Sequence, residues 1–106
     1  MLPPLLVLTL SLLAATDPLT NAPLIPNAVP TEETGRYTSP RNYEGTLKYY
    51  KRYFQATGGV RWHNIINIPT IKARNVTSLR SSTKWEGINI YKEKGNVRIF
   101  IIPRDK

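Results

Sequence analysis

The chain contains no cysteine, only one histidine, and no basic residue before Arg36. The missing cysteines exclude a disulfide framework and any thiolate metal site. With His63 alone and seven carboxylates in all, the sequence carries no pattern for a zinc or calcium site, and we expect no metal and no other cofactor. A domain this small buries little of its surface and usually depends on disulfides or another reinforcement. We therefore expect a marginal monomer or a homo-oligomer.

The scarcity of imidazole and thiol groups also restricts the enzyme classes. There is no cysteine nucleophile, no pair of histidines for acid–base catalysis, and no glycine-rich phosphate loop. One catalytic arrangement remains, that of a secreted ribonuclease, in which the RNA supplies its own 2′-hydroxyl nucleophile. It would use Glu86 as base, His63 as acid, and Arg61 or Arg98 to hold the phosphate. No spacing makes these residues converge, so we predict a protein that is not an enzyme.

An apolar run from Leu5 to Ala15 has the length of a signal-peptide core. It is too short to cross a bilayer as a helix, which needs about 20 residues. Small residues at its end predict cleavage after Ala15 or Thr16, although no Lys or Arg precedes the run. We therefore interpret residues 1–16 as a signal peptide and expect a secreted, extracellular protein.

Residues 17–42 contain five prolines separated by threonine, asparagine and serine, which predicts an extended, disordered lead-in. All three charges before Arg36 are acidic, so this lead-in is either a pro-segment that neutralises the basic remainder or a plain solvated linker. From Arg36 to Lys106 there are fifteen basic residues against four acidic ones, a surplus of eleven positive charges. Such a surplus attracts nucleic acid, sulfated glycans, lipid head groups or acidic protein faces.

Residues 43–106 are predicted to form one small α+β domain. A helix over residues 46–56 is indicated by aromatic and apolar residues at spacings of four, three and four, namely Tyr43, Leu47, Tyr50 and Phe54. Gly58 and Gly59 end it. Beyond them, alternating and isoleucine-rich runs predict three or four antiparallel strands within 60–68, 70–79, 85–91 and 97–102, the last two joined as a hairpin. The helix should pack across one face of this sheet.

A helix followed by antiparallel strands after a signal peptide is similar in order to the cystatin-like inhibitors. The chain has no Gln-x-Val-x-Gly segment, and Trp62 and Trp85 follow Arg61 and Lys84 rather than proline. The resemblance therefore stops at the order of the elements and implies no protease-binding wedge.

Two groups of residues are candidate binding surfaces. In the segment from Tyr49 to Phe54 aromatic and basic residues are interleaved, and Tyr49, Arg52 and Tyr53 would remain on the flank of the helix. Tyrosine and arginine dominate binding hot spots, although core packing explains the same tyrosines. The second group is Lys92, Lys94 and Arg98 on the predicted hairpin. These charges bind an anionic partner or simply protect an exposed strand from aggregation.

The only Asn-x-Ser/Thr sequon with a permitted middle residue begins at Asn75 and predicts a glycoprotein. If the sequon is used, we expect Asn75 on an exposed loop.

Three functions follow, in order of preference. The first is a small secreted basic protein, like an effector, toxin or fluid protein, which binds an extracellular or host macromolecule such as a protein or an acidic glycan. The second is a ribonuclease-like or nucleic-acid-binding protein, because aromatic–basic patterns also suit single strands. The third is a cationic protein that acts on anionic membrane surfaces.

Overall fold

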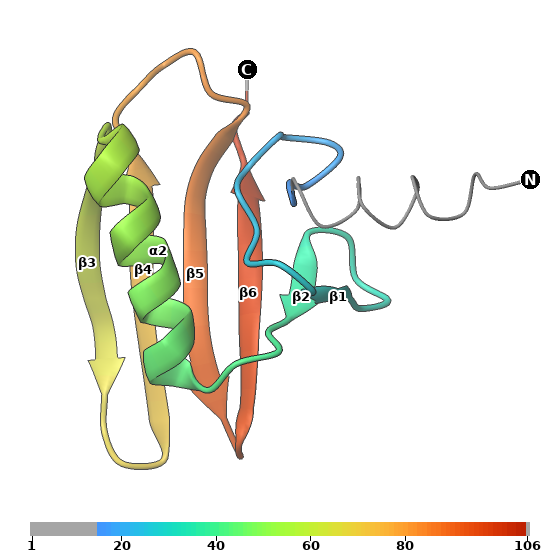
Figure 1. Cartoon of the computed structure of the whole chain (residues 1–106), viewed down its shortest axis with the longest axis vertical. Coiled ribbons are helices and arrows are strands. Elements are labelled where there is room, and N and C mark those ends of the chain that lie inside the picture. Colours follow the sequence, from blue (N-terminus) through green and yellow to red (C-terminus); the bar gives the residue numbers. More distant parts are fainter. Residues whose placement is uncertain (1–14, 106) are drawn as a thin grey trace, which may run out of the picture.

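The computed structural model describes residues 15–105, which form one helix and six strands (Figure 1). In chain order these are β1 (Val29–Pro30), β2 (Arg36–Thr38), α2 (Tyr43–Thr57), β3 (Val60–Asn67), β4 (Ile71–Ser78), β5 (Trp85–Glu93) and β6 (Asn96–Pro103). All strands belong to one antiparallel sheet in the order β1-β2-β6-β5-β4-β3. The predicted signal-peptide core up to residue 14, and Lys106, lie outside the described residues.

The predicted helix is confirmed and is longer at both ends than residues 46–56. It begins after Asn42, whose side-chain Oδ1 accepts a hydrogen bond of 2.7 Å from the Gly45 N–H, as a helix N-cap does. It ends at Gly58, where φ is 68° and the N–H donates to the Phe54 carbonyl at 2.8 Å. The face predicted from the spacing is the buried one, with Thr46 added to it.

The centre of the sheet is built from isoleucines at alternate positions of β5 and β6. Ile88 lies opposite Ile101, and Ile90 lies opposite Ile99, and all four side chains are buried. Because successive side chains on a strand point to opposite faces, their neighbours form the second face of the sheet. The four predicted strands correspond to β3–β6, and two short strands not predicted, β1 and β2, extend the sheet beyond β6.

Residues 15–42 are ordered in the structure, where the sequence predicted a disordered lead-in. Ala22, Leu24 and Ile25 are buried in the core, and the Tyr50 hydroxyl donates a hydrogen bond of 2.9 Å to the Pro23 carbonyl. In Figure 1 this segment runs in front of β6, on the same side of the sheet as α2. In the structure, residues of the segment 15–42 thus pack against residues 43–105.

The width of the sheet explains the difference. Six strands span about 24 Å, whereas one helix with its side chains is about 10–12 Å wide. A single helix therefore leaves β6 and part of β5 uncovered, and a second covering segment is needed. Proline stops residues 17–42 from forming a helix, but it does not stop the apolar residues between the prolines from packing on the sheet.

A buried carboxylate fastens this segment. Asp17 accepts hydrogen bonds from the Thr20 hydroxyl at 2.8 Å and from the Tyr37 hydroxyl on β2. Burial raises the pKa of Asp17, but the hydrogen bonds from Tyr37 and Thr20 outweigh it, so the net pKa lies below the usual value. For Tyr37, burial and the Asp17 carboxylate both raise the phenol pKa. The pair therefore consists of an ionised acid and a neutral phenol.

Candidate functional site

A polar concavity with a converging set of cations lies between α2 and the strands β3 and β4. Two adjoining hollows there have volumes of about 210 and 440 Å³, and both are lined by Lys51 and Arg74. Because they share these two residues, the hollows form one groove along the helix. We call it the basic groove. Its polar and aromatic lining includes Tyr43, Lys51, Trp62, Asn64, Lys72 and Arg74.

The groove exists because β3 is an edge strand, and the main contacts of α2 with the sheet are to β5. On β4, Lys72 and Arg74 occupy alternate positions on the same face as the buried Val76. They therefore point to the side of the sheet that carries the helix. Lys51 faces them from the helix, since it lies one turn after the buried Leu47.

Arg74 is the central residue of the groove. It is half-buried, and its guanidinium carbon lies 5.4 Å from the centroid of the Trp62 ring, within the range of a cation–π contact. Its Nε is buried and has no hydrogen-bond partner among the described residues. Leaving a buried donor unpaired costs about 1–3 kcal/mol. An anionic acceptor entering the groove would recover that free energy.

The charges around Arg74 favour the same ligand type. Lys51 and Lys72 add two cations, and Glu44 is the one carboxylate in the lining. Burial raises the pKa of the Tyr43 phenol, Arg74 opposes that shift and Glu44 adds to it, with a net increase. Tyr43 therefore stays protonated at neutral pH and its hydroxyl can donate a hydrogen bond. The groove offers donors and positive charge, which is the chemistry that binds sulfate, phosphate or carboxylate groups.

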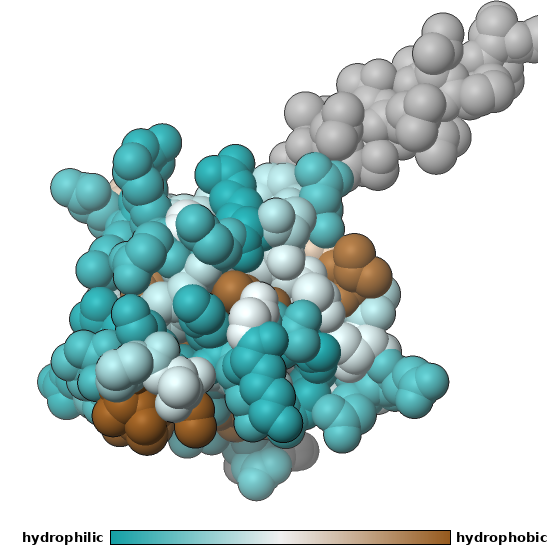
Figure 2. Space-filling view, turned by 90° about the horizontal axis from the view of Figure 1, so that it is seen from below, coloured by the Kyte–Doolittle hydropathy of each residue, from teal (hydrophilic) through white to brown (hydrophobic). Residues whose placement is uncertain are grey.

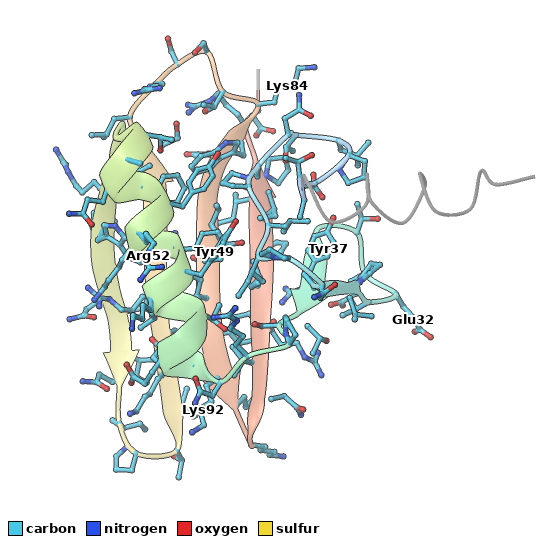
Figure 3. All side chains as sticks on the ribbon, viewed as in Figure 1. Glu32, Tyr37, Tyr49, Arg52, Lys84 and Lys92 are labelled. Atoms are coloured by element: carbon cyan, nitrogen blue, oxygen red, sulfur yellow. The ribbon has the colours of Figure 1, made fainter. Side chains whose placement is uncertain are left out.

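The first predicted surface lies on the helix, and its three residues differ in exposure. Arg52 projects to solvent, whereas Tyr49 lies on the flank of the helix that faces β5 (Figure 3). The Tyr49 ring packs edge-on against Tyr50 at 5.3 Å, and Tyr53 is 38% exposed while packing edge-on against Phe54. Arg52 and Tyr53 are therefore available to a partner. That they bind one stays a prediction.

The second predicted surface is divided between the two faces of the sheet. Lys92 lies opposite Lys72 in the sheet, on the helix side, and Lys94 is in the β5–β6 turn with φ 53°. Arg98 occupies an alternate position to the buried Val97 and Ile99, so it lies on the other face. Lys92 is therefore next to the groove residue Lys72, and Arg98 is on the opposite face of the sheet from both.

The four residues of the ribonuclease hypothesis are not brought together. Arg61 and His63 are exposed on β3, Glu86 is on β5 at a shift in strand register, and Arg98 is on β6. Since β4 and β5 lie between β3 and β6, the outer two strands are about 14 Å apart. Among residues 15–105, no hydrogen bond or ion pair joins any two of the four. Within the same range, no three His, Asp or Glu side chains cluster as metal ligands.

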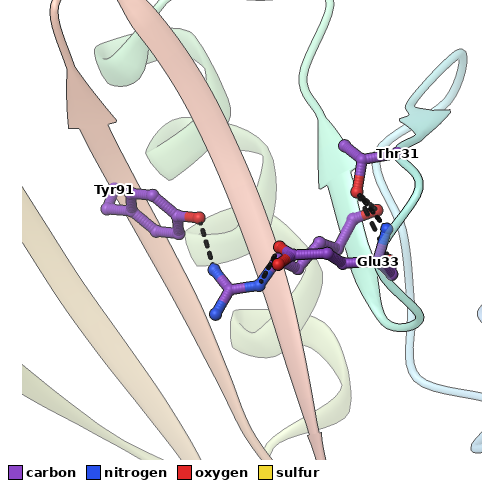
Figure 4. A network of polar contacts seen from close by, with 4 residues as sticks. Thr31, Glu33 and Tyr91 are labelled. Atoms are coloured by element: carbon purple, nitrogen blue, oxygen red, sulfur yellow. Dashed lines mark hydrogen bonds and ion pairs between the residues drawn. The ribbon is translucent and has the colours of Figure 1, made fainter.

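The face of the sheet away from the helix carries a network centred on Arg36. Its Nε lies 2.8 Å from a Glu33 carboxylate oxygen, and its Nη1 donates to the Tyr91 hydroxyl at 2.7 Å (Figure 4). Its guanidinium carbon also lies 4.1 Å from the centroid of the Phe100 ring. One face of Phe100 is therefore covered by the protein's own arginine, which leaves less aromatic surface for stacking a nucleobase.

Asn75 lies in the middle of β4. An exposed loop was the position expected if its sequon is used. Asn75 is instead paired with His63 on β3 and with Asn89 on β5. Its Nδ2 donates to Asn89 Oδ1 at 2.7 Å, and its Oδ1 accepts from the Thr77 hydroxyl at 2.7 Å. Valine and threonine in the sequon favour a strand, and neighbouring strands on both sides supply the pairing. Whether Asn75 is glycosylated stays a prediction.

A second notable feature is an apolar end of the β3–β4 hairpin, which we call the isoleucine tip. Its four side chains are 36–55% exposed and are Ile65, Ile66, Ile68 and Ile71. Seen from that end, a group of hydrophobic residues lies at the lower left of a largely hydrophilic surface, and separate hydrophobic residues lie near its centre and at its right edge (Figure 2). Isolated exposed apolar residues are normal, but a contiguous group of this kind marks a contact surface.

Neither the basic groove nor the isoleucine tip was predicted from the sequence. The period of two from Lys72 through Arg74 to Val76 was a signal that two cations share a face with a core residue. No local signal indicated that α2 would lie across from them. Comparisons with protein-family models, with curated proteins and with solved structures found no match to this chain.

Proposed function

We propose that the protein is secreted and non-enzymatic, and that it acts by binding an acidic glycan in the basic groove. The observation that carries the proposal is Arg74, a half-buried arginine with an unpaired Nε, which has Lys72 beside it on β4 and Lys51 across the hollow on α2. A sulfate or carboxylate would pair with the guanidinium through charge-assisted hydrogen bonds.

The shape of the groove favours a linear polymer over a single small anion. Its two hollows follow one another along α2 and are both lined by Lys51 and Arg74. A glycan with regularly spaced sulfates can place successive anionic groups along such a groove. The surplus of eleven positive charges after residue 35 accelerates the encounter and makes binding sensitive to salt.

No helix within residues 15–105 is long and apolar enough to cross a membrane. The proposal of secretion rests on the apolar run from Leu5 to Ala15. It is tested by expressing the full chain and sequencing the amino terminus of the protein in the medium. A terminus at Thr16 or Asp17 supports the proposal. Retention of Met1 in cell-associated protein contradicts it.

Glycan binding is tested by titrating heparin into the protein and into two variants with matched changes of charge. Lys51→Glu reverses a charge inside the groove, and Arg52→Glu reverses the next charge along the helix, on its solvent side. We expect Lys51→Glu to weaken binding at least tenfold, which is about 1.4 kcal/mol, and Arg52→Glu to weaken it much less. Arg74→Gln should resemble Lys51→Glu.

Equal losses in Lys51→Glu and Arg52→Glu would mean that net charge alone drives binding, and the groove would be the wrong site. A neutral dextran of similar length should not bind the protein. If heparin does not bind but a protein partner is lost on Tyr53→Ala or Arg52→Glu, the surface on the helix is the functional one.

A further inference from the structure

The isoleucine tip needs an explanation that glycan binding does not provide. Eight large hydrophobic side chains are exposed in the described part of the chain, and four of them belong to this one hairpin end. They contribute little to the core, because each of them keeps 36–55% of its surface exposed. Exposed isoleucines at the end of a hairpin are a liability for solubility unless they have a binding partner.

We propose that the isoleucine tip inserts into the interfacial layer of a lipid bilayer that carries anionic head groups. This goes beyond the proposed function, since the ligand is a different one and the inserting side chains are apolar. The two surfaces adjoin at Ile66 and Lys72, which also line the basic groove. Membrane-bound surfaces commonly combine apolar side chains, which enter about 5–10 Å into the boundary between head groups and acyl chains, with lysines that remain at the head groups.

The charge around the tip matches an anionic bilayer. Lys72 directly follows Ile71 on β4, and Lys92 lies opposite Lys72 on β5. Lys94 follows Lys92 in the β5–β6 turn. Figure 3 shows Lys92 at the end of the sheet where the β3–β4 and β5–β6 turns lie. The carboxylates nearest to these lysines are Glu93, opposite Ile71, and Glu44 in the first turn of α2. The lysines outnumber them, so an anionic surface is attracted.

The same charges disfavour a second copy of the chain as the occupant of the tip. Two tips in contact would bring the lysines of both copies together at the rim of the interface. Pairing of two β3 edges is also disfavoured, because the register of β3 against β4 shifts between Asn64 and Ile66. Such a bulge interrupts the straight row of backbone donors and acceptors that edge-to-edge pairing requires.

The backbone at the tip suits shallow insertion. The Ile68 N–H donates to the Ile71 carbonyl at 3.0 Å, which closes the turn. Since polar backbone groups are costly in an apolar medium, a turn that satisfies part of its own hydrogen bonding can approach the acyl chains more easily. Pro69, between these two residues, contributes no N–H that would need a partner.

The test is sedimentation of the full-length protein with vesicles of phosphatidylcholine alone or with 30% phosphatidylserine. We expect binding only to the phosphatidylserine vesicles, with a decrease at high salt. In the double variant Ile65→Asn with Ile68→Asn, partitioning into these vesicles should fall roughly tenfold or more. Two apolar side chains that would be buried in the bilayer are then missing. Lys92→Glu with Lys94→Glu should fall similarly. The matched control, Val29→Asn with Leu79→Asn, removes two equally exposed apolar residues elsewhere and should bind normally.

Because all the substituted side chains are exposed, thermal unfolding should show that each variant is folded. The proposal is overturned if the protein does not bind phosphatidylserine vesicles, or if the isoleucine variant binds them as well as the unmodified protein does. It is also overturned if the unmodified protein is a dimer in the absence of lipid and the isoleucine variant is a monomer. Heparin titration separates the two proposals, because the isoleucine variant should keep its heparin affinity even if vesicle binding is lost.

Discussion

The two halves of the sheet use the same residue type for opposite purposes. In β5 and β6, Ile88, Ile90, Ile99 and Ile101 are at most 1% exposed. In β3, six of the eight residues are exposed, and the isoleucines at the end of the β3–β4 hairpin face solvent. Since the composition of the strands is similar, what distinguishes them is their cover. The helix and residues 15–28 lie over β5 and β6, whereas the edge at β3 has no neighbouring strand.

This difference separates stability from binding. The covered half holds the buried aromatic and aliphatic core, and substitutions there should change the free energy of unfolding. The edge half holds the basic groove and the isoleucine tip, and substitutions there should change binding while leaving stability nearly unaltered. Each prediction below compares one residue or segment of the covered half with a counterpart that lacks its structural role.

The largest effect is expected from deleting residues 1–35, as would happen if the proline-rich segment were a removable pro-segment. The deletion exposes the core beneath Leu24 and Ile25, whose burial is worth roughly 1.5–3 kcal/mol each, and it removes the Asp17 contact with Tyr37. The total approaches the whole stability of a small domain. We expect no cooperative unfolding transition in urea. A chain that begins at Ala15 is the control and should unfold cooperatively. Cooperative unfolding of the shorter chain would show that residues 15–35 are dispensable.

The next largest effect is expected from cavity formation in β6. Ile99→Ala removes a fully buried side chain and should lower the free energy of unfolding by about 2–5 kcal/mol. Ile65→Ala, in the edge half, should change it by less than about 0.5 kcal/mol. Urea denaturation of the two variants measures both. Similar losses in the two variants would mean that the isoleucine tip is buried in solution, for example in an oligomer.

A smaller effect is expected at the buried carboxylate. Asp17→Ala leaves the Tyr37 and Thr20 hydroxyls without their acceptor and should cost about 1–3 kcal/mol. Glu32→Ala, an exposed acidic residue of the same segment, is the control and should have little effect. Chemical denaturation at pH 7 distinguishes the two variants, and an equal loss would refute a specific role for Asp17.

The pH dependence of stability follows from the same group. The pKa of Asp17 is lower in the folded protein than its ordinary value of 3.8. Its contribution is therefore complete above that ordinary pKa and decreases as the pH falls towards the folded pKa. We expect the melting temperature to fall more steeply below about pH 4 in the unmodified protein than in Asp17→Asn. Parallel curves would show that the carboxylate is not ionised in the folded state.

The smallest effect is expected at the start of the helix. Asn42→Ala removes the N-cap hydrogen bond to Gly45 and should cost about 1 kcal/mol. Asn67→Ala, at the exposed end of β3, should be nearly neutral. Thermal melts followed by circular dichroism compare the two variants. If Asn42→Ala is neutral as well, the cap is replaced by water without loss.

Much of the fold could be predicted from local patterns. The spacing of Tyr43, Leu47, Tyr50 and Phe54 identified the helix and its buried face, because a period near 3.6 is set by the geometry of the helix itself. Alternation around Ile88 and Ile99 identified the hairpin of β5 and β6 for the same kind of reason. The structure differs most from the sequence-based expectation in residues 17–42, for which a disordered segment was predicted. Their proline content indicates that they cannot form a helix, but it does not indicate whether their apolar residues pack on the sheet.

The candidate site could not be predicted in the same way. Lys51 and Arg74 are 23 positions apart in the sequence and meet only because α2 crosses the sheet beside β4. The separation of Arg98 from Lys92 depends on the alternation of faces along two strands whose register the sequence did not establish. The same applies to Asn75, which pairs with strands on both sides.

The sequence by itself determined the helix, the long strands, the strong positive charge after residue 35 and the absence of disulfides. These properties depend on composition and on periods of two and 3.6 residues, which act over short stretches of chain. The tertiary structure decided which isoleucines are buried, which cations share a groove and how residues 15–42 are used. Those outcomes depend on how a narrow helix and an apolar segment divide the cover of a six-stranded sheet, and that division is set by contacts between distant parts of the chain.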